Sequence, residues 1–171
     1  IIFYFIPLSA EIAKEIKISG NKRVSEETIK VYGDIEVNKN YNEVELNKIL
    51  QNLNSTNFFE DIKISLENNI LKIDLIEYPI ISQLLVVGEP SKKFTEQIKK
   101  LMGLKEKQSF IKSNLSKDID LIKKLYSGAG YNSSKVDAKI RKIDNRSVEL
   151  VIEIERGNKT KISKISFTGD K

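Results

Sequence analysis

The stretch ISKISFTGDK (residues 162–171) contains alternating apolar residues followed by a glycine. The same arrangement occurs in EIKISGNKR (15–23) and in SQLLVVGEPSK (82–92). An apolar residue at every second position predicts a strand with one buried face, and the glycine permits a turn with positive φ. Intervals of roughly 70 and 80 residues between these glycines indicate an array of small domains. The turn glycines are Gly20, Gly88 and Gly169.

Two helices and a hairpin are predicted after the first glycine. Ser25 can cap one helix, and Asn42 can cap a second helix whose apolar stripe runs over 46–53. Apolar residues then alternate over 62–66 and over 71–75, as in two strands of a hairpin. The first unit therefore has the order β-α-α-β-β.

The second glycine is followed by the same order of elements. A strand is predicted over 83–87, a helix over 91–102 and a second helix from Ser113. Alternation returns over 136–140 and over 148–154, which predicts another hairpin. The order β-α-α-β-β is thus present twice.

This order predicts the fold class α+β. Because the two helices return the chain to the end of the sheet where it started, the first and third strands run parallel and the second antiparallel. Each unit is then a three-stranded mixed sheet, in the order first, third, second strand, with two helices on one face. We expect domains at 11–78 and 79–156, and the first strand of a third copy within 157–171.

Residues 1–10, IIFYFIPLSA, are apolar and uncharged, and a polar segment follows them. They are too few to span a bilayer, and we interpret them as the end of a secretory signal peptide with Ala10 before the cleavage site. A buried N-terminal strand and a truncated inner-membrane anchor are the alternatives. A secreted location agrees with the absence of cysteine, since an oxidising compartment then has no thiol to act on.

The composition argues against catalysis. Cysteine, histidine and tryptophan are absent, which excludes thiol nucleophiles, Cys/His zinc sites and the commonest general base. The carboxylate pairs Glu60-Asp61 and Asp118/Asp120 lie at a strand start and at i, i+2 of a helix, and we interpret them as structural. No phosphate-binding glycine loop is present. We therefore predict no enzyme, no metal and no cofactor.

The net charge is +5 and the pI about 9.2. Lysine, asparagine and isoleucine are abundant throughout, and the lysine pairs are spread along the chain. This favours a solvated surface of mixed charge over a patch for nucleic acid or anionic lipid. The pairs are Lys92-Lys93, Lys99-Lys100 and Lys123-Lys124.

Five stretches occur in a definite order: IKISGNKRVSEETI, NFFEDIKISL, IEYPIISQLLVVGE, LYSGAGYNSSKV and IEIERGNKTKISKISFTGDK. In this order and spacing they resemble tandem POTRA (polypeptide-transport-associated) domains over residues 16–171. Two details depart from the family pattern. Gly88-Glu89-Pro90 replaces a turn rich in glycine and asparagine, and the second linker, Arg156-Gly157, lacks a proline.

The resemblance implies a periplasmic part of an outer-membrane protein. POTRA domains of this kind receive unfolded outer-membrane proteins and dock accessory lipoproteins, while a C-terminal membrane barrel of the same chain inserts the clients. The resemblance implies no nucleic-acid partner. Two alternatives stay open: the POTRA region of a two-partner secretion transporter, and a division-septum-type interaction protein, against which two complete copies argue.

The second strand of each unit should lie at an edge of its sheet. Its unpaired backbone groups can accept a client strand by β-augmentation. Charged residues at alternate positions either protect these edges from aggregation or flank a docking groove, and proline at Lys63 or Lys139 should remove a donor of the edge. The candidate residues are Asp61, Ile62, Lys63, Ile64, Ser65, Leu66, Glu67, Val136, Asp137, Ala138, Lys139, Ile140 and Arg141.

The junctions after each unit are candidate hinges. Proline restricts its own φ and pushes the preceding residue toward an extended conformation, so Tyr78-Pro79 should limit the swing between domains. An ordinary proline at a strand start is the alternative. The predicted hinge residues are Tyr78, Pro79, Arg156 and Gly157.

Overall fold

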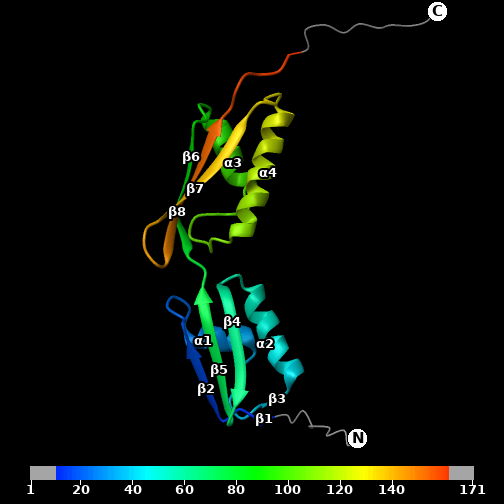
Figure 1. Ribbon diagram of the computed structural model, residues 1–171, viewed down its shortest axis with the longest axis vertical. Helices are drawn as coiled ribbons and strands as arrows, with labels where there is room; N and C mark the ends of the chain where they lie inside the picture. Colours follow the sequence, from blue (N-terminus) through cyan, green and yellow to red (C-terminus); the bar gives the residue numbers. More distant parts are fainter. Residues whose placement is uncertain (1–10, 162–171) are drawn as a thin grey trace, which may run out of the picture. The chain divides into compact units, whose positions relative to one another are not determined.

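The computed structural model describes residues 11–161, and the chain divides into two compact units, Ile1–Tyr78 and Pro79–Lys171. The predicted signal-peptide end at 1–10 lies outside the described residues. The same holds for Gly169 and for most of the predicted third copy. Figure 1 shows the elements of the two units.

The first unit contains a three-stranded mixed sheet in the order β2-β5-β4, with β2 parallel and β4 antiparallel to β5. Both helices lie on one face, where they bury Ile29, Ile49 and Leu53 against Leu71 and Ile73 of β5. The predicted fold class is confirmed. The elements are β1 (Glu11–Ile12), β2 (Glu15–Ser19), α1 (Glu26–Gly33), β3 (Asn40–Tyr41), α2 (Glu43–Ser55), β4 (Phe59–Glu67) and β5 (Ile70–Glu77).

Both predicted helix caps are present in the first unit. The Ser25 side chain accepts a hydrogen bond from the N–H of Thr28 at 3.2 Å, and Asn42 accepts one from Glu45 at 3.0 Å. Each bond satisfies an N–H that has no partner within the helix, which explains why the helices begin there. The two-residue strands β1 and β3 pair antiparallel and were not predicted.

The second unit repeats the topology with the strand order β6-β8-β7. β6 runs parallel and β7 antiparallel to β8, and Ser91, where the helix was predicted to begin, caps α3. α4 begins after Ile111 without a side-chain cap. The elements are β6 (Ile80–Val87), α3 (Lys92–Leu101), α4 (Lys112–Gly128), β7 (Lys135–Lys142) and β8 (Ser147–Glu155).

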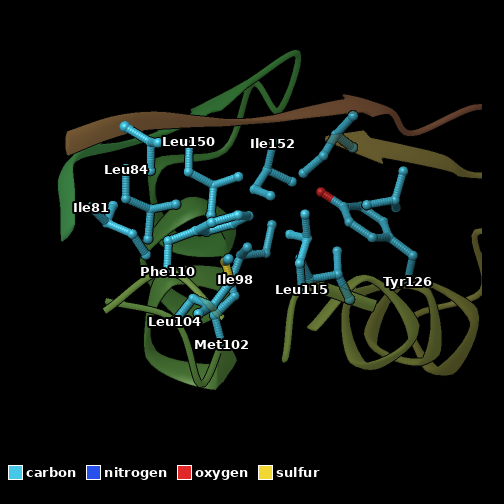
Figure 2. Packing of buried hydrophobic residues seen from close by; sticks show 14 residues of the cluster. Ile81, Leu84, Ile98, Met102, Leu104, Phe110, Leu115, Tyr126, Leu150 and Ile152 are labelled. Atoms are coloured by element: carbon cyan, nitrogen blue, oxygen red, sulfur yellow. The ribbon is translucent and has the colours of Figure 1, made fainter. Parts of the chain in front are cut away.

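The core of the second unit lies between its sheet and its helices. Figure 2 shows Ile81 and Leu84 of β6 and Leu150 of β8 pointing toward side chains from the helical layer, among them Ile98 and Tyr126. Fully burying a side chain of this size stabilises a fold by about 1.5–3 kcal/mol. Because each unit encloses its own cluster of buried residues, each has its own hydrophobic core.

The repeated glycine is required by a close approach of two backbones. Gly20 has a φ of 82°, and a Cβ atom there would lie 1.9 Å from the carbonyl oxygen of Leu75. Gly88 has a φ of 83°, and its Cβ would lie 2.1 Å from the carbonyl oxygen of Ile154. Any side chain would therefore collide with the last strand of its unit, while the positive φ also favours glycine.

The two carboxylate pairs have structural roles. Glu60 lies at the bulge of β4, where the register with β5 shifts between Phe59 and Asp61. Asp118 is buried in α4 and accepts hydrogen bonds from the N–H groups of Gly103 at 2.6 Å and Leu104 at 2.9 Å. It ties the α3–α4 loop to the helix.

Candidate functional site

The candidate site consists of the outer edges of β4 and β7. Within residues 11–161, β4 pairs only with β5 and β7 pairs only with β8. All thirteen residues predicted for the edge strands lie in these two elements. The backbone register decides which of them can pair with an additional strand.

In β4 the hairpin turn sets the register. Asn68 and Asn69 have φ values of 54° and 62°, typical of a two-residue hairpin turn, so Glu67 belongs to a hydrogen-bonded pair beside the turn. Bonded and non-bonded pairs alternate along antiparallel strands, so Ser65 and Lys63 are also bonded to β5. The backbone groups directed away from β5 belong to Ile62, Ile64 and Leu66.

The same argument applies to β7. The N–H of Ile143 donates to the carbonyl of Ser147 at 3.1 Å, which marks a bonded pair at the start of the hairpin loop. Counting back along the register, the residues bonded to β8 have odd numbers. The outward backbone groups of β7 therefore belong to Val136, Ala138, Ile140 and Lys142.

This register corrects one expectation drawn from the sequence. Lys63 and Lys139 both occupy bonded pairs, so their N–H groups face the neighbouring strand of their own sheet. Proline at either position would break the domain's own ladder and would leave the outer edge with its donors. Proline removes an outward donor only at the alternate positions, for example at Ile64 in β4 and at Ile140 in β7.

The charged side chains at alternate positions are paired within their own sheets. In the second unit Lys135 contacts Glu155 at 2.9 Å, Lys139 contacts Glu153 at 2.7 Å, and Arg141 contacts Glu149 at 3.0 Å. In the first unit Lys63 contacts Asp61 at 3.9 Å and Lys72 contacts Glu67 at 3.6 Å. Such exposed pairs contribute little stability, but they keep charge beside an edge that could otherwise aggregate.

The opposite edge of the second sheet is partly covered by a loop. The N–H of Ile81 donates to the carbonyl of Gln108 at 2.8 Å, and the N–H of Lys107 donates back to Ile81 at 2.7 Å. Further along β6, the N–H of Leu84 donates to the carboxylate of Glu106 at 2.9 Å. The loop between α3 and α4 thus occupies half of the β6 edge, which the sequence did not predict.

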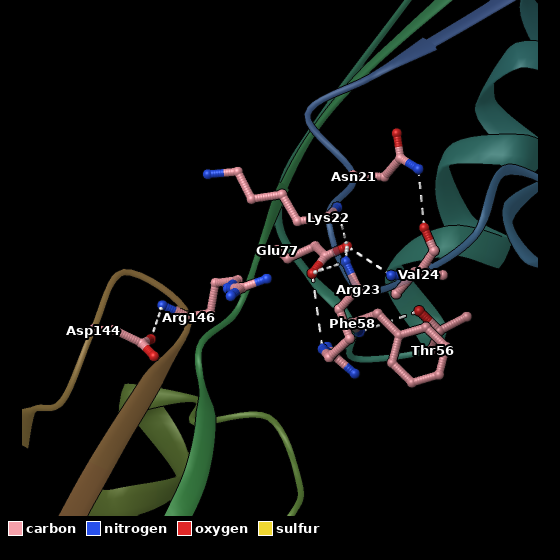
Figure 3. A network of polar contacts seen from close by, with 9 residues as sticks. All are labelled: Asn21, Lys22, Arg23, Val24, Thr56, Phe58, Glu77, Asp144 and Arg146. Carbon is pink, nitrogen blue, oxygen red and sulfur yellow. Dashed lines mark hydrogen bonds and ion pairs between the residues drawn. The ribbon is translucent and has the colours of Figure 1, made fainter.

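A buried carboxylate holds the end of β5. Glu77, whose side chain is 9% exposed, accepts hydrogen bonds from the N–H groups of Lys22 at 2.8 Å and of Arg23 and Val24 at 2.9 Å (Figure 3). Burial alone would raise the pKa of Glu77, but these donors and the Arg23 guanidinium outweigh it and lower the pKa below its ordinary value. The Arg23 guanidinium also lies 5.7 Å from the centre of the Phe58 ring.

The second unit contains a related pair of a carboxylate and an arginine. In the first unit the arginine follows the first strand of the sheet and the carboxylate ends the last strand, and in the second unit these positions are exchanged. Here the carboxylate, Glu89, lies in the loop after β6, and Arg156 follows the last strand, with 3.4 Å between their charged atoms. Glu89 has no exposed side-chain surface and also accepts from the hydroxyl of Tyr126. Burial, followed by this hydrogen bond, raises the pKa of Tyr126. The Arg156 guanidinium lies 4.9 Å from the centre of the Tyr131 ring.

The predicted hinge residues are anchored within their own units. The N–H of Tyr78 donates to the carbonyl of Phe58 at 2.9 Å, and the carbonyl of Pro79 accepts from Phe110 at 2.7 Å. Arg156 belongs to the carboxylate group described above, and Gly157 has a φ of 68°. Their part in motion between domains stays a prediction.

Other kinds of site find no support in the part of the chain that the structure describes. Residues 11–161 hold no cluster of three or more acidic side chains arranged to bind a metal ion. No described helix combines the length and apolar character needed to cross a bilayer. Every buried side-chain nitrogen or oxygen atom among the described residues has a hydrogen-bond partner.

Comparison with known proteins gives matches over most of the chain. The POTRA family model, described as "Surface antigen variable number repeat", matches residues 12–77 and 79–157. The outer membrane protein assembly factor BamA of Neisseria meningitidis serogroup B is 28% identical over 160 residues, which are 92% of this chain and 20% of that protein. BamA of Neorickettsia risticii is 28% identical over 161 residues, 94% of this chain and 22% of that protein.

Among solved structures, the N-terminal domain of Omp85 from the thermophilic cyanobacterium Thermosynechococcus elongatus is similar, with a TM-score of 0.54 and 15% identity. The match covers 84% of this chain and 63% of that one, and it shows a shared fold. The chain spans about a fifth of the length of the two curated relatives.

Proposed function

The chain belongs to the POTRA family, and from this premise we propose that it is a periplasmic scaffold in the assembly of outer-membrane proteins. The similarity to two proteins named as outer membrane protein assembly factors supports this role. In the proposed mechanism each unit receives an unfolded β-barrel precursor as an additional strand of its sheet. Docking of accessory lipoproteins, and a C-terminal barrel that inserts the precursor, are parts of the same proposal.

The observation that carries the proposal is the open edge of each sheet. Ile62, Ile64 and Leu66 in β4 direct backbone donors and acceptors outward, and Val136, Ala138 and Ile140 do so in β7. The side chains of Ile62, Ile64, Leu66, Val136 and Ala138 pack against the cores, and Ile140 is 42% exposed. A strand added there would extend the sheet beside the helices. Main-chain pairing tolerates many sequences, as a receiver of different precursors requires.

The loop on the β6 edge supports β7 as the edge of the second unit that accepts a client strand. Because the loop over 106–109 already bonds to Ile81 and Leu84, an incoming strand would have to displace those bonds at β6. At β7 it meets no competing hydrogen bond from the described residues. The second unit therefore directs strand addition to one side.

The linker is proposed to restrict the direction in which each unit presents its edge. Tyr78 and Pro79 each make a backbone hydrogen bond within their own unit, which leaves few free torsions between the anchored atoms. Pro79 also fixes its own φ near −65°. Arg156-Gly157 would act in the same way after the second unit.

The test compares proline with alanine at the two outward positions. The double variant Ile64→Pro/Ile140→Pro removes one outward N–H from each edge and keeps the ladders to β5 and β8. The matched control, Ile64→Ala/Ile140→Ala, removes the same side chains and keeps both donors. A labelled peptide of about ten residues with the alternating pattern of a barrel strand serves as the client.

We expect at least about tenfold weaker peptide binding for the proline variant and less than about threefold for the alanine variant. Each proline removes a hydrogen bond and also blocks the approach of the added strand. Equal losses would show that side chains, not the backbone edge, recognise the client, and would overturn the mechanism. Both variants must first give amide spectra like those of the unmodified chain, which shows that both units are folded.

A second measurement keeps the test decisive if proline unfolds a unit. A nitroxide on the peptide should broaden amide signals of β4 and β7 in the unmodified chain, and leave those of β6 sharp. Broadening centred on β6 would contradict the proposed edges. The chain has no cysteine, so only the peptide carries the label.

A further inference from the structure

The helical layer of the second unit concentrates positive charge. Residues 92–124 contain ten lysines and four acidic residues, a balance of +6, whereas the whole chain has a net charge of +5. The rest of the chain therefore carries about one negative charge in sum. We call this group the basic helical layer; its lysines are Lys92, Lys93, Lys99, Lys100, Lys105, Lys107, Lys112, Lys117, Lys123 and Lys124.

No ion pair joins these lysines to the four carboxylates of the same segment. Asp118 is buried and accepts from two backbone N–H groups, and Glu106 accepts from the N–H of Leu84. None of the ten lysines forms an ion pair with a described residue, although Lys105 donates to the carbonyls of Lys99 and Lys100 at the end of α3. Eight of them are exposed.

Other segments of the chain carry a smaller positive balance or a negative one. In the first unit, residues 26–55 contain six acidic residues and three lysines, a balance of −3. On the far face of the second sheet, Lys135, Lys139 and Arg141 each pair with a glutamate. The largest excess of positive charge therefore lies in the segment 92–124 of the second unit.

The fold creates this face. α3 and α4 lie on the same side of the sheet (Figure 1), where Ile98 and Ile122 pack in one core, so the solvent-facing residues of both helices lie on that side. The lysines are dispersed in the sequence, but the helices that carry most of them pack on one side of the unit. A sum over neighbouring charges determines the local potential, which sequence spacing alone does not reveal.

We propose that the basic helical layer docks on the surface of an anionic phospholipid membrane. All ten cations are lysines, and lysine is depleted in protein–protein interfaces, whereas arginine supplies the planar donors typical of specific protein contacts. Lysine ammonium groups are attracted to anionic headgroups while they stay hydrated. Leu101 and Leu121, 41% and 37% exposed, lie among the lysines and can contact the boundary between headgroups and acyl chains.

This docking is separate from strand addition. It uses the helices of the second unit, while the proposed client edge is the outer side of β7, and it does not depend on the family assignment. A unit held against a membrane by its helices would keep its sheet face, with the paired charges, directed away from the lipid.

The experiment measures partition of the purified chain onto vesicles at 0.1 M salt. Vesicles of phosphatidylcholine with about a quarter phosphatidylglycerol should bind the chain, and pure phosphatidylcholine vesicles should not. The test variant replaces four exposed lysines of the layer by glutamine: Lys93→Gln, Lys100→Gln, Lys117→Gln and Lys124→Gln. The control removes the same charge from exposed lysines of the first unit: Lys14→Gln, Lys17→Gln, Lys48→Gln and Lys72→Gln.

We expect the test variant to lower the partition coefficient at least about tenfold and the control to change it less than about twofold. Each lysine near an anionic surface contributes about a fivefold factor, and not all four can touch at once. Raising the salt to 1 M should release the chain, because the Debye length falls from about 10 Å to about 3 Å.

Three results would overturn the proposal. One is equal loss in both variants, which would mean that net charge alone drives adsorption. Another is binding to neutral vesicles or retention in 1 M salt, since neither depends on lysine attraction. The third is tighter binding to an RNA or DNA duplex than to anionic vesicles at the same salt, which would assign the face to nucleic acid.

Discussion

Glu77→Gln should destabilise the first unit because the carboxylate receives three backbone hydrogen bonds in a site that is almost closed to water. Hydrogen bonds to a charged group contribute about 1.5–3 kcal/mol each. The three share one carboxylate, and water can reach the N–H groups of Lys22 and Arg23 after the change, since both residues are exposed. The glutamine amide also keeps one acceptor oxygen.

We therefore expect a loss of about 2 kcal/mol in the free energy of unfolding of the first unit. For a domain of this size, about 1 kcal/mol corresponds to about 4–8 °C in Tm, so the transition should fall by about 8–16 °C. Amide resonances of the first unit report its unfolding, and those of the second unit serve as an internal reference. The exposed Glu67, which pairs with Lys72 at 3.6 Å, supplies the control Glu67→Gln, with a loss below about 0.5 kcal/mol.

The pH dependence adds a second check. The pKa of Glu77 lies below its ordinary value of 4.5 in the folded chain, so its contribution is present above the unfolded pKa and is lost as pH falls through the folded pKa. The difference in the free energy of unfolding between wild type and Glu77→Gln should have its full value at neutral pH and should shrink in acid below about pH 4. A difference that is absent at pH 7, or unchanged in strong acid, would refute the argument from the carboxylate.

The remaining predictions concern one glycine and one tyrosine. Gly88→Ala should cost about 3 kcal/mol or more and unfold the second unit selectively in urea, because a Cβ would lie 2.1 Å from a carbonyl oxygen at a positive φ. Its control is Gly128→Ala, which meets no atom within 4 Å and should be neutral or slightly stabilising. Tyr126→Phe should cost about 1.5–3 kcal/mol at pH 7 by removing a donor to the buried Glu89. Because the pKa of Tyr126 is raised in the folded chain, this stabilisation is present below the unfolded pKa of 10.0 and is lost as pH rises beyond it. The difference in Tm between wild type and Tyr126→Phe should therefore narrow above about pH 10. A constant difference would contradict the hydroxyl–carboxylate bond.

The sequence predicted the elements that depend on local patterns. Ser25 and Asn42 cap helices as expected, because a cap and its N–H partner are three residues apart. β1 and β3 were missed, since a strand of two residues has no periodicity to detect. The start of α4 was placed only approximately, because Ile111 supplies no capping side chain.

The roles of three glutamates, Glu77, Glu89 and Glu106, could not be predicted. Glu77 bonds to backbone groups more than fifty residues away, and Glu106 bonds to a strand in the preceding part of its unit. A backbone N–H carries no residue-specific signal, so its partner is invisible in the sequence. Glu89 and Arg156 form their pair across the same kind of distance.

By itself, the amino-acid sequence determined the repeat, the order of elements and the strand order of each sheet, because periodicity and chain connectivity restrict these strongly. Only the tertiary structure decided which backbone groups of β4 and β7 face outward, since that depends on the hairpin register and not on residue type. It also decided that lysines distant in sequence form one basic face, because packing of α3 beside α4 sets the distances between charges.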